Sequence, residues 1–207
     1  MAEIAAIILA AGRSSRFDAG AQDTKLIAPL FGKPLVRYVA EAALASRARP
    51  ILVVTGHAAG KVEAALAGLD LFLIANPHYQ TGLSSSLKAG IAALPKTAAG
   101  AVILLADMPR ISAELIDRLI GIFEASIEAP RAVTPVRAGS RGNPVLIGRT
   151  LFDAVAHLEG DRGARRLVEA ERKGVLECSV EDDAIEIDID TRDALSRLEA
   201  ETTTSGR

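Results

Sequence analysis

Short, continuous apolar runs alternate along the first half of the chain with longer segments in which apolar residues recur every three or four positions. A continuous run suits a strand that is covered on both faces of a sheet, whereas the second spacing is typical of a helix. Strands are predicted on this basis at residues 6–11, 51–55, 71–75 and 101–106. Helices are predicted between them, at residues 33–46, around Val62 and Leu66, and at residues 82–94 and 112–123. The alternation predicts right-handed crossovers and a parallel sheet with helices on both faces.

The second half of the chain has a less regular pattern. Strands are predicted at residues 131–136, 143–147, 175–180 and 185–189, and helices at residues 151–158, 164–172 and after Thr191. We therefore expect an α/β fold with three layers (helices, sheet, helices), in which the sheet is mostly parallel and contains an antiparallel strand. The length of 207 residues suits one domain. We place this domain at residues 1–201 and a flexible tail at residues 202–207.

The composition narrows the class of protein. A net charge of −2 and an aromatic content of 3% give no support to a nucleic-acid partner or to an anionic membrane surface. Cys178 is the single cysteine, which excludes an internal disulfide and a thiolate metal cluster, and we expect it to be a buried structural thiol. The sequence has no apolar run as long as a membrane span and no secretory signal pattern, so we expect a cytoplasmic protein.

A Gly/Ser/Arg loop follows the first predicted strand, with the sequence Gly12-Arg13-Ser14-Ser15-Arg16 and a lysine, Lys25, shortly after it. The backbone N–H groups of such a loop can form a concave anion site, and arginine adds forked donors that match phosphate oxygens. The loop lacks the Gly-Lys-Ser/Thr end of a P-loop and the three glycines of the G-x-G-x-x-G fingerprint. We interpret it as a triphosphate site. The alternative is an ordinary turn with solvent-facing arginines.

Acidic residues stand at two further positions where chemistry is expected. Asp107 directly follows the fourth predicted strand, and a carboxylate there, close to a triphosphate, suits Mg²⁺. Its alternative role is an Asx-turn. In segment 185–190 isoleucines alternate with acidic residues, so a strand there would place Asp188 and Asp190 on the face opposite the isoleucines. From the pattern alone, a solvated edge strand is favoured for this pair, and Asp190 also precedes the helix cap predicted at Thr191.

Three polar segments complete the candidates. Serines 84–86 follow Gly82 at a predicted helix start, where hydroxyl and N–H groups can bind an anion or a ribose. Segments 139–144 and 160–165 are rich in glycine and carry arginine, which suits a phosphate. The alternatives are helix N-capping for the serines and solvated turns for the two loops.

The motif Leu9-Ala10-Ala11-Gly12-x-Ser14-x-Arg16, with Lys25 after it, resembles the signature of the nucleotidyltransferases that act on molybdopterin. It is most similar to the branch that makes molybdopterin cytosine dinucleotide, because the guanylyltransferase relatives have Leu-Ala-Gly-Gly. The segment Asp107-Met108-Pro109, the Asp-x-Asp-Thr element at 188–191, the serine cluster and both Gly/Arg loops extend the resemblance over nearly the whole chain. The path from Arg16 to Lys25 is longer than is usual in the family.

This resemblance implies a Rossmann-like nucleotidyltransferase fold and a Mg²⁺-dependent transfer of CMP from CTP to the phosphate of molybdopterin, a step of molybdenum cofactor biosynthesis. It implies catalytic roles for Lys25, Arg16 and Asp107, and Mg²⁺ ligands at Asp107, Asp190 and, less strongly, Asp188. The implied nucleotide-binding residues are Leu9, Ala10, Ala11, Gly12, Arg13, Ser14, Ser15, Arg16, Lys25, Gly82, Ser84, Ser85 and Asp107. The implied acceptor-binding residues are Arg141, Gly142, Asn143, Asp161 and Arg165.

Two kinds of alternative remain open at this point. Among enzymes, the protein could be a guanylyltransferase of the same cofactor, using GTP, or could act on a sugar phosphate or an alcohol phosphate. Outside enzymes, it could be an accessory protein that delivers cofactor to a molybdoenzyme. A molybdoenzyme or its maturation chaperone is accordingly a candidate partner, besides CTP and molybdopterin. The presence of both Asp107 and Lys25 favours an enzyme.

Overall fold

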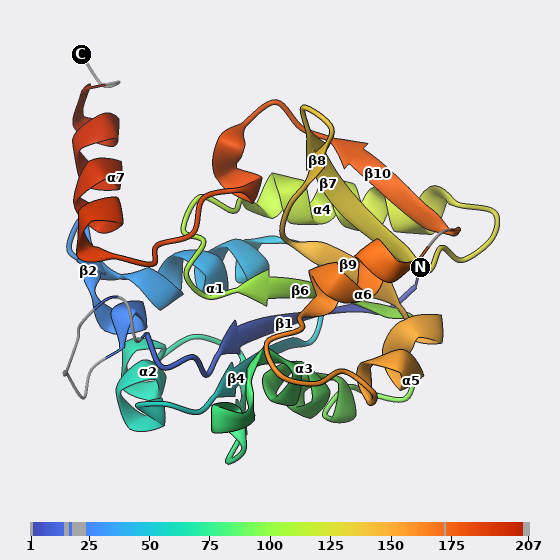
Figure 1. The fold of residues 1–207 in the computed structure, drawn as a ribbon, viewed down its shortest axis with the longest axis horizontal. Coiled ribbons are helices and arrows are strands. Elements are labelled where there is room, and N and C mark those ends of the chain that lie inside the picture. The colour runs from blue at the N-terminus through green and yellow to red at the C-terminus, as the bar shows by residue number, and fades with distance from the viewer. Residues whose placement is uncertain (1, 15–16, 18–23, 172, 205–207) are drawn as a thin grey trace.

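The computed structural model describes residues 2–14, 17, 24–171 and 173–204. At its centre lies β1 (Ile4–Ala10), whose seven residues are all buried. β1 pairs in parallel with β4 (Ile51–Thr55) on one side and with β6 (Gly100–Leu105) on the other. β5 (Phe72–Ala75) adds a further parallel strand beyond β4 (Figure 1). The four strands predicted from continuous apolar runs are therefore confirmed.

Four more strands extend the sheet beyond β6: β7 (Ala132–Arg137), β8 (Ser140–Arg141), β9 (Val145–Gly148) and β10 (Val175–Ser179). The strand order is β10-β7-β9-β6-β1-β4-β5, with β8 paired to β7. β9 is antiparallel to both of its neighbours, and β8 is antiparallel to β7, while β10 is parallel to β7. The sheet is thus mixed and mostly parallel, as predicted. Cys178 on β10 is a buried free thiol.

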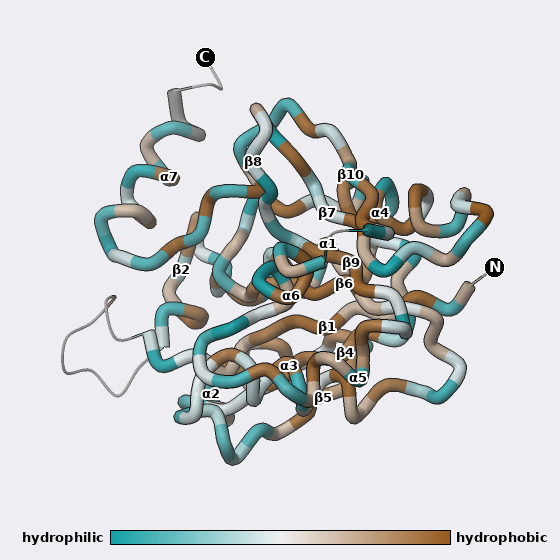
Figure 2. The backbone as a smooth tube through the Cα atoms, turned by 45° about the vertical axis from the view of Figure 1, so that its right-hand side comes forward, coloured by the Kyte–Doolittle hydropathy of each residue, from teal (hydrophilic) through white to brown (hydrophobic). Residues whose placement is uncertain are grey.

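Helices cover both faces of this sheet. One face carries α1 (Leu35–Ala45), α2 (Ala59–Ala65) and α4 (Ala113–Ala125), and the other carries α3 (Leu83–Ala92), α5 (Phe152–Val155) and α6 (Ala164–Ala170). Side chains of β1 alternate between the two cores, so Ile8 belongs to the first and Ile7 to the second. Figure 2 shows the apolar central strands inside a more polar periphery. In the described part of the chain, no helix is long and apolar enough to cross a membrane.

A third, smaller cluster attaches the last helix, α7 (Arg192–Thr204), to the edge of the molecule near β2 (Figure 1). The cluster contains Phe17, Leu30, Leu35, Ile189 and Leu198. The hydroxyl of Thr191 accepts a hydrogen bond from the N–H of Ala194 at 3.1 Å, which confirms the predicted cap. α7 continues to Thr204, so the helix extends into the segment that was expected to be a tail.

Two local predictions were wrong. Segment 185–189 is not a strand: a 3₁₀ turn, η4 (Asp183–Ile185), is followed by irregular chain. The buried, exposed alternation persists there because Ile185 and Ile189 fill the core, but their backbone groups bond to different segments. The helix predicted at 33–46 begins two residues late, because β3 (Lys33–Pro34) pairs with β2 (Pro29–Leu30). Further 3₁₀ turns are η1 (Lys25–Ile27), η2 (Tyr79–Thr81) and η3 (Arg149–Leu151).

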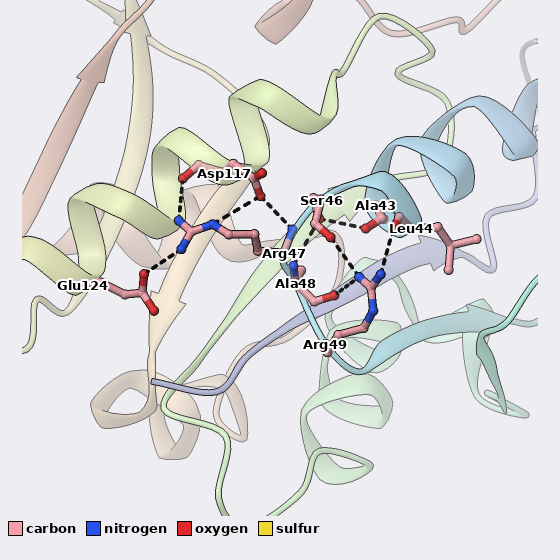
Figure 3. A network of polar contacts seen from close by, with 8 residues as sticks. All are labelled: Ala43, Leu44, Ser46, Arg47, Ala48, Arg49, Asp117 and Glu124. Atoms are coloured by element: carbon pink, nitrogen blue, oxygen red, sulfur yellow. Dashed lines mark hydrogen bonds and ion pairs between the residues drawn. The ribbon is translucent and has the colours of Figure 1, made fainter. Parts of the chain in front are cut away.

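Two arginines stabilise the connection between α1 and β4, and one of them, Arg47, joins it to α4 (Figure 3). The N–H of Arg47 donates to Asp117 at 2.7 Å, and the Arg47 guanidinium bonds to Glu124 at 3.0 Å. Arg49 instead donates to backbone carbonyls of the same turn, those of Leu44, Ser46 and Ala48. The network satisfies carbonyl groups at the end of α1 and places the chain for its entry into β4.

Gly90 on α3 is required by close packing, and we predict that Gly90→Ala destabilises the protein. A Cβ at this position would lie 2.5 Å from Cγ2 of Ile7 on β1. Alanine normally favours a helix over glycine by about 1 kcal/mol, but overpacking a core costs about 1–3 kcal/mol, so the net change is a loss. Urea denaturation measures it.

Gly121→Ala on α4 is the matched control. The nearest atom to a Cβ there is Nη2 of Arg47 at 3.8 Å, an ordinary contact. This variant should gain about 0.5–1 kcal/mol from helix propensity. If Gly90→Ala were stabilised equally, α3 would not pack directly on β1.

Candidate active site

A cavity of about 410 Å³ opens at the carboxyl ends of β1 and β6. One wall is the loop after β1, the second is the start of α3, and polar side chains converge on the floor between them. The lining residues include Leu9, Ala11, Gly12, Arg13, Ser14, Lys25, Gly82, Ser86, Asp107 and Asp161. Most of these were predicted as site residues. The position agrees with the rule that ligands of α/β sheets bind beyond the carboxyl ends of the strands.

Ser14 joins the two ends of the loop that follows β1. Its hydroxyl accepts a hydrogen bond from the N–H of Lys25 and lies within hydrogen-bond distance of the Thr24 hydroxyl, both at 3.1 Å. Gly12 and Arg13 are exposed on the cavity wall. Ser15 and Arg16 lie outside the described residues, so their phosphate contacts stay predictions.

Lys25 lies on the cavity floor and is 9% exposed. Its Nζ atom is 2.7 Å from Oδ2 of Asp107 and 2.6 Å from Oδ1 of Asp190. The three residues come from η1, the turn after β6 and the segment before α7. The structure thus brings together the lysine and the two carboxylates that the sequence singled out separately.

The charges in this group shift one another's ionisation. Burial by itself would lower the pKa of Lys25, but the charge and hydrogen bond of Asp107, followed by those of Asp190, outweigh it and raise the pKa above its ordinary value. Burial also raises the pKa of Asp188, and the negative charges of Asp107 and Asp190 raise it further. Lys25 is therefore held as an ammonium ion, whereas Asp188 ionises less readily than a free carboxyl group.

The residues present fit a divalent cation. Carboxylate oxygens of Asp107, Asp188 and Asp190 all lie within 4.8 Å of one another. Oδ1 of Asp107 is buried without a hydrogen-bond partner, which is costly unless another group bonds to it. Mg²⁺ and Mn²⁺ prefer such oxygen donors. This acidic triad therefore has the donor set and the unsatisfied oxygen that a divalent metal ion would use.

The start of α3 is occupied by protein groups. The N–H of Ser84 donates to the carbonyl of Gly160 at 3.0 Å, and the N–H of Leu83 donates to Asp161 at 3.4 Å. Gly82, at φ 109°, passes so close that a Cβ would lie 2.3 Å from the carbonyl carbon of Gly160. The start of α3 is thus bonded to the loop at residues 160–161. Neither Ser84 nor Ser85 is among the residues that line the cavity.

Asn76 supports the cavity wall at Ser86 and was missed by the sequence reasoning. Its side-chain amide donates to the hydroxyls of Ser85 and Ser86 at 2.9 and 3.0 Å, and it is buried. Asn76 follows β5 directly, so the same argument from strand ends that found Asp107 could have found it. Tyr79 and Gln80 on η2, which line the cavity nearby, carried no comparable signal.

The residues predicted for the acceptor side are distributed unevenly. Of the predicted acceptor residues, Asp161 borders the cavity. Among the predicted nucleotide-binding residues, Ala10 is buried in the core. Arg141 and Arg165 bond to nearby glutamates instead, and the N–H groups of Gly142 and Asn143 donate to backbone carbonyls; the four partners are Glu177, Glu169, Pro135 and Ile185. Roles in acceptor binding stay predictions for all of them.

Comparison with known families decides the assignment. A family model described as the MobA-like NTP transferase domain matches residues 6–175, which include the loop after β1, Lys25 and Asp107. The chain belongs to the MobA-like NTP transferase domain family. This membership agrees with the predicted nucleotidyltransferase fold, while the cytosine branch is a finer assignment than the match provides.

Two relatives of this chain have names that indicate different activities. The bifunctional protein GlmU of Syntrophotalea carbinolica is 33% identical over 149 residues, which are 72% of this chain and 31% of that protein. The chain spans about a third of the length of the GlmU relatives it matches. Nicotine blue oxidoreductase of Paenarthrobacter nicotinovorans is 29% identical over 208 residues, covering 94% of this chain and 96% of that protein.

One relative of known structure has also been solved with a bound metal ion. Rv0371c of Mycobacterium tuberculosis superposes with a TM-score of 0.83 at 27% identity, covering 96% of this chain and 98% of its own. The same protein is also known in complex with manganese, with a TM-score of 0.77. A divalent ion in a relative of this similarity agrees with the donor set of the acidic triad in this family member.

Asp188→Asn should stabilise the metal-free protein at neutral pH. Because folding raises the pKa of Asp188, the folded state binds more protons than the unfolded state between the two pKa values, and stability falls as the pH rises through that window. The asparagine variant avoids this loss, so its melting temperature in EDTA should exceed that of the wild type at neutral pH. Below about pH 4 the two should converge.

Saturating Mg²⁺ provides the control, since it should favour the wild type, which keeps all three carboxylates. Equal melting temperatures in EDTA at neutral pH would show that Asp188 is not destabilised by its neighbours.

Proposed function

We propose that the protein is a Mg²⁺-dependent cytidylyltransferase that transfers CMP from CTP to the terminal phosphate of molybdopterin and releases pyrophosphate. The observation that carries the proposal is the convergence of Lys25 with Asp107 and Asp190 beside the loop after β1. Family membership supports a nucleoside triphosphate as the donor. The motif from Leu9 to Arg16 supports cytosine and molybdopterin.

The chemistry needs no strong general base. An oxygen of the acceptor phosphate, already anionic, attacks the α-phosphorus of the nucleotide, and the bond from that phosphorus to the bridging oxygen breaks as pyrophosphate leaves. Rate enhancement then rests on positioning and on neutralising charge. Lys25 would supply an ammonium group for charge that grows at the α-phosphate, and the loop amides, Arg16 and the cavity-lining Arg13 would bind the remaining phosphates. Asp107, Asp188 and Asp190 would hold Mg²⁺, which when bound neutralises phosphate charge.

Ala11 is the residue that we connect with base selection. It is 3% exposed and lines the cavity. A Cβ at Gly56 would lie 2.8 Å from the Cβ of Ala11, so the methyl group faces the turn after β4. The N–H of His57 also donates to the Ala11 carbonyl at 3.2 Å. The wall at Ala11 is therefore held by its neighbours, and the preference for cytosine is proposed from the sequence motif.

An oxidoreductase is a second candidate, because the similarity to nicotine blue oxidoreductase extends over nearly the whole chain. Two observations weigh against it. Gly12 stands without the further glycines of the dinucleotide fingerprint. The cavity floor carries carboxylates and an ammonium group, which suit phosphate and a metal ion.

The deciding experiment measures pyrophosphate release from each of the four NTPs, with and without molybdopterin, and oxidation of NADPH with the same preparation. We expect release that requires both CTP and molybdopterin. Release with GTP, or with a sugar phosphate as acceptor, would move the assignment within the family. NADPH oxidation without pyrophosphate release would favour the oxidoreductase. Binding of molybdopterin without any turnover would favour a delivery protein.

Asp107→Asn should retain the fold and lower kcat by roughly 10²–10³-fold, because it removes a charged metal ligand at the reacting phosphates. The measurement is kcat across a Mg²⁺ titration, with the melting temperature as a check on folding.

Asp117→Asn is the matched control for this substitution. Asp117 lies on α4 and accepts its hydrogen bond from the N–H of Arg47 through Oδ1, which an amide oxygen can replace, so kcat should be unchanged. A normal kcat for Asp107→Asn at low Mg²⁺ would remove Asp107 from the site.

Ala11→Gly should narrow the preference for CTP over GTP. One methyl group in a pocket is worth about 1–3 kcal/mol, or roughly 10–200-fold. The measurement is the ratio of kcat/KM for the two nucleotides in both proteins. A wild-type preference for GTP would overturn the cytosine assignment and leave nucleotidyl transfer intact.

A further inference from the structure

Lys25 makes two short ion pairs with residues of the acidic triad, Asp107, Asp188 and Asp190. Its Nζ atom lies 2.7 Å from Asp107 and 2.6 Å from Asp190. These are the distances of charge-assisted hydrogen bonds, and the lysine side chain is only 11% exposed. In the protein alone, the ammonium group of Lys25 therefore fills the role of a cation among these carboxylates.

A divalent metal ion and this ammonium group compete for the same oxygens. Each metal–oxygen bond of Mg²⁺ or Mn²⁺ needs an oxygen lone pair at about 2.0–2.2 Å. Two cations that share a carboxylate in a partly buried site repel each other. The buried oxygen of Asp107 that has no partner, Oδ1, offers one contact without disturbing Lys25, but Oδ2 of Asp107 and Oδ1 of Asp190 are already bonded to it.

The backbone at Lys25 is held by hydrogen bonds, while its side chain borders a cavity into which it can turn. Its N–H donates to the hydroxyl of Ser14, and Thr24 caps the short η1 turn. The long stem of Lys25 lines the same cavity as Gly12 and Arg13, on the wall where phosphate is expected. A phosphate in the cavity gives the ammonium group a new anionic partner without moving the main chain.

We propose that Lys25 is the resident counter-ion of the acidic triad and that its transfer from the carboxylates to a nucleotide phosphate couples nucleotide binding to metal binding. The proposal rests on the proposed function only in taking that phosphate from a nucleotide. Departure of Lys25 removes its positive charge from the three carboxylates, and a divalent ion would replace that charge. Each ligand therefore binds better when the other is present, and by linkage the coupling is reciprocal.

The first test measures the affinity of nucleotide-free protein for Mn²⁺ by electron paramagnetic resonance of the free ion. Lys25→Met and Lys25→Gln, two neutral replacements, should bind Mn²⁺ roughly tenfold more tightly than the wild type, because a competing cation is gone. Lys25→Arg keeps the charge and should keep the weak affinity. Lys33→Met is the matched control: Lys33 pairs with Glu41 away from the cavity, so its loss should leave Mn²⁺ affinity unchanged.

The second test adds a non-hydrolysable CTP analogue and repeats the Mn²⁺ titration. Chelation of Mn²⁺ by the analogue in solution is the same for every variant, so the comparison isolates the protein. The gain in Mn²⁺ affinity should be at least severalfold larger in the wild type and in Lys33→Met than in Lys25→Met.

The outcomes separate the two proposals. Mn²⁺ affinity that is equal or weaker in both neutral variants would overturn the counter-ion role, even if the wild type releases pyrophosphate from CTP. Tighter Mn²⁺ binding in those variants, combined with no pyrophosphate release from any NTP by the wild type, would support the counter-ion role and overturn the proposed function.

Discussion

Burial of β1 on both faces is the constraint on which the rest of the structure depends. A slip of one residue would exchange its two sets of side chains between the two cores, so the register with β4 and β6 is fixed. The chain must then leave β1 beside the end of β6, where the N–H of Ala106 donates to the carbonyl of Leu9. Backbone geometry, rather than attraction between side chains, brings the loop after β1 next to Asp107.

The same constraint explains how much could be predicted from the sequence. Continuous apolar runs predicted the four central strands, and the residues that follow them gave Lys25 and Asp107 as separate candidates for the site. Segment 185–189 was wrongly predicted as a strand because burial of Ile185 and Ile189 produces the same alternation as an edge strand. The close approach of Gly82 to Gly160, like the Arg141–Glu177 pair, depends on contacts between distant segments that carry no local pattern.

The described residues at the two ends of the loop after β1 are held by specific contacts. Ser14 bonds to Thr24 and to the N–H of Lys25, and Phe17 packs into the cluster that holds α7, with the guanidinium of Arg192 5.3 Å from the centre of its ring. Ile189, between two residues of the acidic triad, belongs to the same cluster. One apolar cluster thus contacts both the loop after β1, through Phe17, and the segment that carries Asp188 and Asp190, through Ile189.

The contact between Lys25 and Asp190 joins positions 165 residues apart. Closing so long a loop is entropically costly, and contacts of this kind form late in folding because the intervening elements must be in place first. A folding intermediate with a complete central sheet but an undocked α7 would retain the loop after β1 and lack part of the acidic triad. Under the proposed function, metal-supported nucleotide binding would therefore report completion of the native state, and partly folded molecules would be inactive.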